Sequence, residues 1–272
     1  MLGHGVRSRY TSGMGLTIHY DLYAPKIKTL AEARKLLGPL QQFAKKQRFK
    51  KTSKILTWKQ GKDDPGLVQL FSYPIYIEKP GKELVILWAK PVEIAFFVVN
   101  QPGSEVASFG LARHEATACD MAGEHEQRTR LTGWNWRVFC KTQYASMSTA
   151  GGWENFFKIH DGICRVLDEA KRLGMKVKVQ DEARYWENRD VPALKAEIHR
   201  WNTMIAAVTG RFKDMAGGRE GAIVAPITKE PDFEHLEAQG QHFLLENAEV
   251  HVIRLPEGRK GKAPAARKKR KK

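Results

Sequence analysis

The spacing of apolar residues between positions 151 and 210 constrains the fold more than any other feature of the chain. Apolar side chains recur every three or four residues over 152–174, which predicts an amphipathic helix. A short β-rich run at 176–179 predicts a strand, and the helical spacing returns over 192–210, where Gly210 is expected to end the second helix. A helix, a strand and a second helix in this order indicate helices packed against a sheet.

The N-terminal part of the chain is richer in predicted strands. Residues 16–23 alternate as a half-buried strand does, and Thr29 with Glu32 forms a capping box that begins a helix. Gly38-Pro39 is expected to kink or interrupt this helix. We expect an α+β fold, in which an N-terminal strand–helix–strand series with a mostly antiparallel sheet precedes the helix–strand–helix half. The further β-rich runs are 53–59, 66–79, 83–90 and 92–100, with a suggested final strand at 242–255.

The chain is expected to contain a single globular body. Residues 14–257 carry the α+β pattern, with a possible sub-domain boundary at 100–104, where the series of strands stops. Residues 1–13 are polar and rich in glycine. Residues 258–272 contain nine Lys or Arg, no acidic residue and no large apolar residue. Neither terminal segment can bury apolar surface, so both are expected to be disordered.

The net charge of +16 is divided unevenly along the chain. Residues 1–60 hold 13 Lys and Arg against Asp21 and Glu32, whereas residues 61–257 are slightly acidic. Six cations lie within the ten residues 45–54, with no acid among them. Two separated basic regions on a near-neutral body are typical of proteins that bind polyanions.

We therefore predict a nucleic-acid-binding protein that contacts the phosphate backbone with little dependence on base sequence. The basic N-terminal segment supplies a fixed patch, and the tail supplies an extended arm. A second interpretation is that the tail is a localisation signal on a protein-interaction module. The predicted nucleic-acid-binding residues are Lys45, Lys46, Arg48, Lys50, Lys51 and Lys54 in the segment, and Arg267, Lys268, Lys269, Arg270, Lys271 and Lys272 in the tail.

The loop between the short strand and the second helix offers an alternative function. Asp181 and Glu182 are adjacent carboxylates of the kind that bind a divalent cation, and Arg184 and Arg189 suit a phosphate. They predict a metal-dependent enzyme that acts on nucleic acid or another phosphorylated substrate. The structural interpretation of this loop is that Asp190 caps the next helix and that the other charges pair with one another.

His160 is a third candidate for a catalytic role. It lies one helical turn from Cys164, and such a pair can supply two zinc ligands. A partly buried imidazole beside a packed thiol is the simpler interpretation. Because no second pair with ligand spacing completes a four-ligand site, no bound metal is predicted.

The segment 114–126 is also rich in metal-ligating residue types. It begins like the HExxH motif, but the position of the second histidine is Ala118, which excludes a zincin site. His125 with Glu124 or Glu126 is a possible acid–base pair.

The run 134–141 predicts a strand with two different faces. Alternation places Trp134 and Trp136 on one face, which is typical of a core, and Arg137, Phe139 and Lys141 on the other. An aromatic residue flanked by cations on an exposed sheet face resembles, in its chemistry, the surfaces that bind single-stranded nucleic acid.

Other common machinery is missing from the sequence. There is no P-loop, no GxGxxG fingerprint and no GxSxG elbow, and the longest apolar run, 94–99, is too short to cross a bilayer. The three cysteines form no CxxC pair. We expect a cytoplasmic protein that does not insert into a membrane, with no disulfide framework and no cofactor, apart from a divalent cation in the enzyme alternative.

Overall fold

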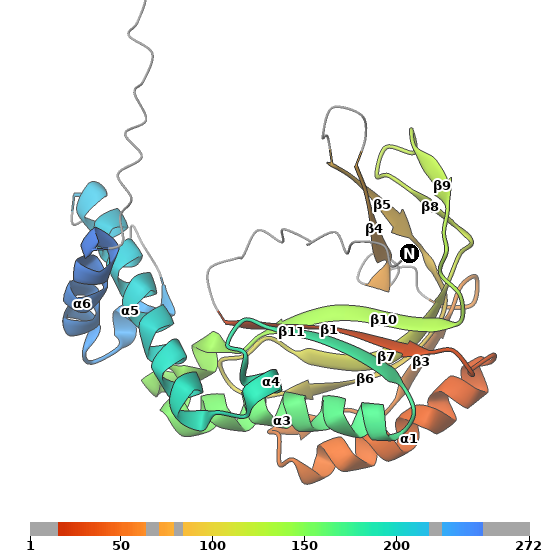
Figure 1. Cartoon of the computed structure of the whole chain (residues 1–272), viewed down its shortest axis with the longest axis horizontal. Helices are drawn as coiled ribbons and strands as arrows, with labels where there is room; N and C mark the ends of the chain where they lie inside the picture. The colour runs from red at the N-terminus through yellow and green to blue at the C-terminus, as the bar shows by residue number, and fades with distance from the viewer. Residues whose placement is uncertain (1–15, 64–70, 79–83, 218–224, 247–272) are drawn as a thin grey trace, which may run out of the picture.

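The computed structural model describes residues 16–63, 71–78, 84–217 and 225–246, and its fold is α+β, as predicted (Figure 1). The predicted terminal segments 1–13 and 258–272 lie outside the described residues. The strands are β1 (Thr17–Ala24), β2 (Lys51–Thr52), β3 (Leu56–Lys59), β4 (Tyr73–Glu78), β5 (Leu84–Ala89), β6 (Pro91–Asn100), β7 (Ala107–His114), β8 (Thr117–Cys119), β9 (Glu126–Arg128), β10 (Trp134–Lys141) and β11 (Lys176–Asp181). The helices are α1 (Leu30–Lys46), α3 (Gly152–Arg172), α4 (Tyr185–Asn188), α5 (Val191–Met215) and α6 (Phe233–Glu246), with 3₁₀ turns η1 (Gln143–Ser146), η2 (Ser148–Ala150) and η3 (Pro226–Lys229).

The described strands form two sheets whose pairings are antiparallel. The larger sheet has the order β11-β1-β10-β7-β6-β2, and β3 also pairs with β6. The smaller sheet has the order β4-β5-β8-β9 and rises from one end of the larger sheet (Figure 1). Helices α1 and α3 cover one face of the larger sheet, and no helix of the described residues covers the opposite face of β11, β1 and β10 (Figure 1).

The core lies between the larger sheet and its two helices. Tyr20 stacks on Phe109 with ring centroids 5.5 Å apart, and Phe97 stacks on the other side of Phe109 at the same separation. The apolar stripe predicted for α3 is buried, with Phe156 and Ile163 inaccessible to solvent. Buried residues from before and after the 100–104 segment share this core. That segment is part of the turn between β6 and β7, so the chain does not divide there into separate cores.

Helix α1 begins as its sequence predicts. The Thr29 side chain accepts a hydrogen bond from the Glu32 backbone, and the Glu32 carboxylate accepts one from the Thr29 N–H. Pro39 lies inside the helix without interrupting it. The helix therefore runs continuously across one face of the sheet and ends at Lys46, within the basic segment.

Helices α5 and α6 form a hairpin that extends from the body (Figure 1). The prediction that α5 ends at Gly210 is wrong, because the helix continues through it to Met215. A side chain at 210 would collide with Glu237 of α6, and a side chain at Gly240 would collide with Thr203 of α5. These two glycines permit close helix packing. The predicted final strand is also wrong over 242–246, which ends α6; the rest of it lies outside the described residues.

Strands β10 and β7 separate over most of their length. A single residue pair, Asn135 with Ala112, joins them. The Tyr20 hydroxyl and the Trp136 indole N–H instead both donate to the Ser108 carbonyl, at 2.8 and 3.0 Å. These side chains fill the gap and satisfy a carbonyl that the ladder leaves unpaired.

None of the described helices has both the length and the apolar character that a membrane-spanning helix needs.

Candidate functional sites: a basic groove and a buried polar network

The basic segment 45–54 presents all six of its predicted cations to solvent, and the fold holds it in place. Phe49 is buried against Gly162 of α3, where a β-carbon would lie 2.6 Å from its ring. The Gln41 amide donates to the Ser53 carbonyl and fastens the segment to α1. The exposed residues are Lys45, Lys46, Arg48, Lys50, Lys51 and Lys54.

A groove between α1 and β3 extends this charged surface. It is an open depression of about 790 Å³, and its walls include Arg34 and Lys35 from α1 and Lys59 from β3. The groove follows from the chain path, because β3 pairs with the edge of β6 and runs back alongside α1 immediately after the basic segment. Arg34 and Lys35 of α1 therefore line one groove with Lys59 of β3, and the 45–54 segment connects these two walls along the chain.

The acid that lines this groove does not cancel its charge. Glu93 lies 3.1 Å from Lys59 Nζ and 3.1 Å from Arg113 Nε. Burial disfavours the charged form of Glu93, but the hydrogen bonds from Lys59 and Arg113 hold its pKa below the ordinary value. Within the described residues, Arg34 and Lys35 form no ion pair. The groove keeps a positive charge.

Arg34 and Lys35 were not among the predicted binding residues, whereas Lys59 ends the basic N-terminal segment that was predicted as the phosphate-contacting patch. The helical spacing of α1 indicates that Arg34 and Lys35 face solvent, because Ala33 and Leu37 face the core. Their junction with the 45–54 segment depends on β3 returning along α1, which no local sequence signal specifies.

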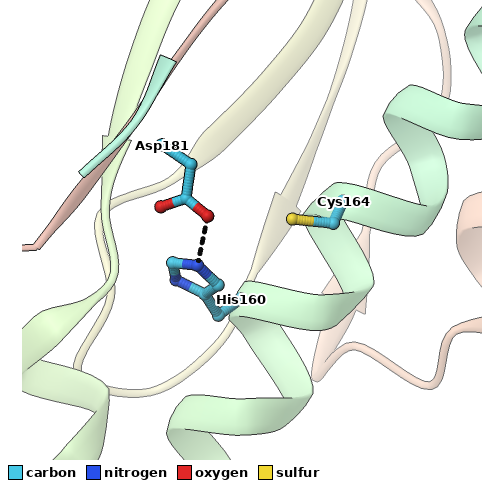
Figure 2. Close-up of side chains that lie close together, drawn as sticks. All are labelled: His160, Cys164 and Asp181. Carbon is cyan, nitrogen blue, oxygen red and sulfur yellow. Dashed lines mark hydrogen bonds and ion pairs between the residues drawn. The ribbon is translucent and has the colours of Figure 1, made fainter. Parts of the chain in front are cut away.

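A second cluster of functional side chains lies inside the protein. His160 projects from α3 toward Asp181 at the end of β11, and its Nε2 lies 3.1 Å from Asp181 Oδ2 (Figure 2). The other ring nitrogen, Nδ1, lies 2.9 Å from the hydroxyl of Thr142. The side chains of His160 and Asp181 are inaccessible to solvent. The sequence proposed these two residues for separate reasons, and the structure brings them together.

The carboxylate of Asp181 is fully engaged. Its Oδ1 accepts from the Ala183 N–H and its Oδ2 accepts from the Trp186 N–H, each at 2.9 Å. Burial disfavours the carboxylate, but the hydrogen bond and charge of His160, together with these two N–H groups, hold the pKa of Asp181 below its ordinary value. The network thus ties α3, β11 and α4 together.

Thr142, His160 and Asp181 reproduce the hydroxyl, imidazole and carboxylate of a catalytic triad, but not its accessibility. Thr142 and His160 are completely buried, and neither lines the groove beside α1. A nucleophile must contact its substrate, so the burial of Thr142 favours a structural role for this arrangement.

Cys164 adds a third metal-ligating residue to the network. Ligand atoms of His160, Cys164 and Asp181 lie within 4.8 Å of one another (Figure 2). Burial, reinforced by the charge of Asp181, raises the pKa of the Cys164 thiol. His160 and Asp181 already contact each other, the Thr142 hydroxyl and two backbone N–H groups, so hydrogen bonds account for the positions of their side chains.

The structure separates the two carboxylates of the enzyme hypothesis. Asp181 faces α3, whereas Glu182 accepts a hydrogen bond from the Thr17 N–H at 2.9 Å and lies 3.9 Å from His19 Nε2 on β1. Their partners lie on different faces of the sheet, so the arrangement does not favour one shared cation. The enzyme hypothesis remains a prediction.

The structural interpretation of this loop is correct for its helix cap but not for its charges, because Arg189 pairs with α3 outside the loop and, among the described residues, Arg184 forms no ion pair. Asp190 caps α5 by accepting from the Ala193 N–H at 3.0 Å. Arg189 pairs with Asp168, and the hydroxyl of Tyr185 donates to Asp161 at 2.8 Å. Burial and this hydrogen bond raise the pKa of Tyr185 to about 12.

The histidine of the 114–126 segment has a different acidic partner from those predicted. His125 Nδ1 lies 2.6 Å from Asp120 Oδ2, in the connection between β8 and β9. The hydrogen bond from His125 holds the pKa of Asp120 below its ordinary value. Asp120, Glu124 and His125 form a partly exposed cluster of metal-ligating types, and nothing further indicates an ion there.

Comparisons of the chain with protein-family models, curated proteins and solved structures find no match.

Proposed function

We propose that this protein binds nucleic acid through the phosphate backbone, along the groove between α1 and β3 and the adjoining 45–54 segment. The observation that supports this proposal is the continuity of exposed cations along a single surface, with an acid in the groove that two cations already neutralise. Phosphates are evenly spaced anions, and a row of Lys and Arg binds them whatever the base sequence.

The rigidity of the surface favours binding to an extended polyanion. The buried Phe49 and the bond from Gln41 to Ser53 fix the backbone of the segment, so its cations lose little backbone entropy when they bind. Lysine and arginine side chains on a fixed backbone act as positioning contacts for phosphate.

The tail has a supporting role in this proposal. Its nine Lys and Arg make a second basic region that adds phosphate contacts to those of the groove. The protein would act in the cytoplasm, where thiols remain reduced, and its three cysteines are free.

The first experiment is fluorescence anisotropy with labelled single-stranded and duplex oligonucleotides at increasing salt. The expected slope of log affinity against log salt is roughly −5 to −8 for about six to nine neutralised phosphates. The triple variant Lys50→Ala, Lys51→Ala, Lys54→Ala should reduce the magnitude of this slope by about 2 to 3. Absence of binding near ~50 mM salt, the low end of the range where phosphate contacts are strongest, would contradict the proposal.

A matched control removes the same number of charges elsewhere. Arg211, Lys213 and Lys229 are exposed on α5 and η3, away from α1. The triple alanine variant at these positions should leave the salt slope unchanged. If both triple variants weaken binding equally, the interaction follows net charge and the groove has no special role.

A further inference from the structure

The uncovered face of β11, β1 and β10 carries a regular grid of aromatic and polar side chains. The register aligns three cross-strand rows, because His19, Asp21 and Tyr23 of β1 each face a residue on both neighbouring strands. The rows are Phe139–His19–Gln180, Arg137–Asp21–Lys178 and Asn135–Tyr23–Lys176.

An aromatic ring stands exposed at one end of this grid. The side chain of Phe139 is 54% exposed. It belongs to β10, an interior strand of the larger sheet, and the tryptophans on the other face of β10 are buried. Its ring centroid lies 5.7 Å from that of His19. Gln180 and Lys178 are exposed on the adjacent strand. The alternation predicted for 134–141 is present, with both tryptophans buried and Phe139 on the opposite face.

The cations of this face outnumber its acids, which are Asp21 and Glu182, the latter 3.9 Å from His19 Nε2. Arg137 neutralises Asp21 through two hydrogen bonds of 2.8 and 2.9 Å. Lys176 lies 5.6 Å from the centre of the Tyr23 ring. Within the described part of the chain, Lys178 forms no ion pair. The aromatic rings are therefore accompanied by cations that complement a polyanion.

The exposed ring of Phe139 selects single-stranded over duplex nucleic acid, because stacking on it needs a base whose face is free. A duplex keeps its base faces inside the stack, whereas a single strand exposes them to aromatic side chains.

We propose that the open face of β11, β1 and β10 binds single-stranded nucleic acid, with a base stacking on Phe139 and with Lys178 contacting phosphate. This inference rests on the proposed function and specifies its substrate class. In this scheme the groove beside α1 contacts the phosphates of both single-stranded and duplex nucleic acid, and the sheet face binds the single-stranded form selectively.

The test compares Phe139→Ala with Phe212→Ala, because Phe212 is 48% exposed on α5 and provides a matched loss of an exposed ring. Affinity is measured by anisotropy for a 20-nucleotide oligothymidine and for a 20-base-pair duplex. Phe139→Ala should weaken single-strand binding by about 5- to 100-fold, as expected for loss of one stacked base, and change duplex binding by less than about twofold. Phe212→Ala should change neither.

Two further variants complete the test. Phe139→Leu keeps an apolar side chain but removes the aromatic face, and should lose most of the same single-strand affinity. Lys178→Ala should lower the magnitude of the single-strand salt slope by about one. Unchanged single-strand affinity in Phe139→Ala, or an equal loss for both ligands, would overturn the inference while leaving the groove intact. Unchanged binding in the 50/51/54 variant, with the Phe139 effect present, would instead overturn the proposed groove.

Discussion

The His160–Asp181 network and the groove beside α1 both use charged or polar side chains, but in opposite environments. In the network, the side chains of both members are fully buried, and both ring nitrogens and both carboxylate oxygens have partners. In the groove, Arg34 and Lys35 are exposed and form no ion pair within the described chain. A buried polar group must be satisfied internally, whereas a binding surface keeps its charges available. Residue types that suggest catalysis, such as histidine and aspartate, can therefore be structural, whereas exposed lysines and arginines remain available to bind a ligand.

The largest expected effect is on stability. His160→Ala leaves the buried Asp181 carboxylate without its main partner, which should lower the free energy of unfolding by about 3–5 kcal/mol. Urea denaturation followed by circular dichroism measures the change, and His199→Ala, at an exposed position on α5, is the control. If the His160→Ala protein is as stable as the wild type but no longer binds nucleic acid, the network serves binding, and the contrast between a structural network and a binding groove is wrong.

An intermediate effect is expected on affinity without a change in stability. Arg34→Ala with Lys35→Ala should weaken binding to both duplex and single strand by roughly 25-fold, at about fivefold for each lost phosphate contact. Because both side chains are exposed, the free energy of unfolding should change by less than about 0.5 kcal/mol. The double variant Arg34→Lys with Lys35→Arg preserves both charges and should bind normally. Equal affinity of the alanine and charge-preserving variants would remove the groove from the binding surface.

The smallest effect is a pH dependence of stability that belongs to the network. The folded protein holds the pKa of Asp181 below its ordinary value, so the unfolded chain binds a proton at higher pH than the folded protein does. The resulting stabilisation is present above the unfolded pKa of about 4 and is lost as the pH falls through the folded pKa. Over this acidic range, the free energy of unfolding of the wild type should fall more steeply with decreasing pH than that of the Asp181→Asn variant. Parallel pH profiles would show that Asp181 contributes no such linkage.

Local patterns predicted much of the secondary structure. The helix at 152–172, the strand at 176–181 and the capping box at Thr29 follow from spacing and from short-range hydrogen bonding. Gly210 misled the prediction because glycine serves two purposes: it can end a helix, and it can let a second helix approach closely. The contact with α6 that decides between them involves residues distant in the sequence.

The candidate sites were predicted less completely than the fold. The sequence identified His160 and Asp181, but 21 positions separate them, and only the packing of α3 on β11 brings their side chains to 3.1 Å. The adjacency of Asp181 and Glu182 suggested a shared site, although successive residues of a strand project to opposite faces. The structure shows the six cations of 45–54 exposed to solvent, and their role in binding stays a prediction; the sequence did not indicate that Arg34 and Lys35 lie across a groove from Lys59.

The sequence by itself determined the charge distribution, the amphipathic helices and the alternation that leaves Phe139 on the opposite face from Trp136, because these depend on residue type and local periodicity. The tertiary structure decided which polar groups are enclosed and which remain open to a ligand, because burial depends on which elements pack together. That distinction makes the His160–Asp181 pair a structural tie and the α1–β3 groove, with the face that carries Phe139, the surface proposed for nucleic acid.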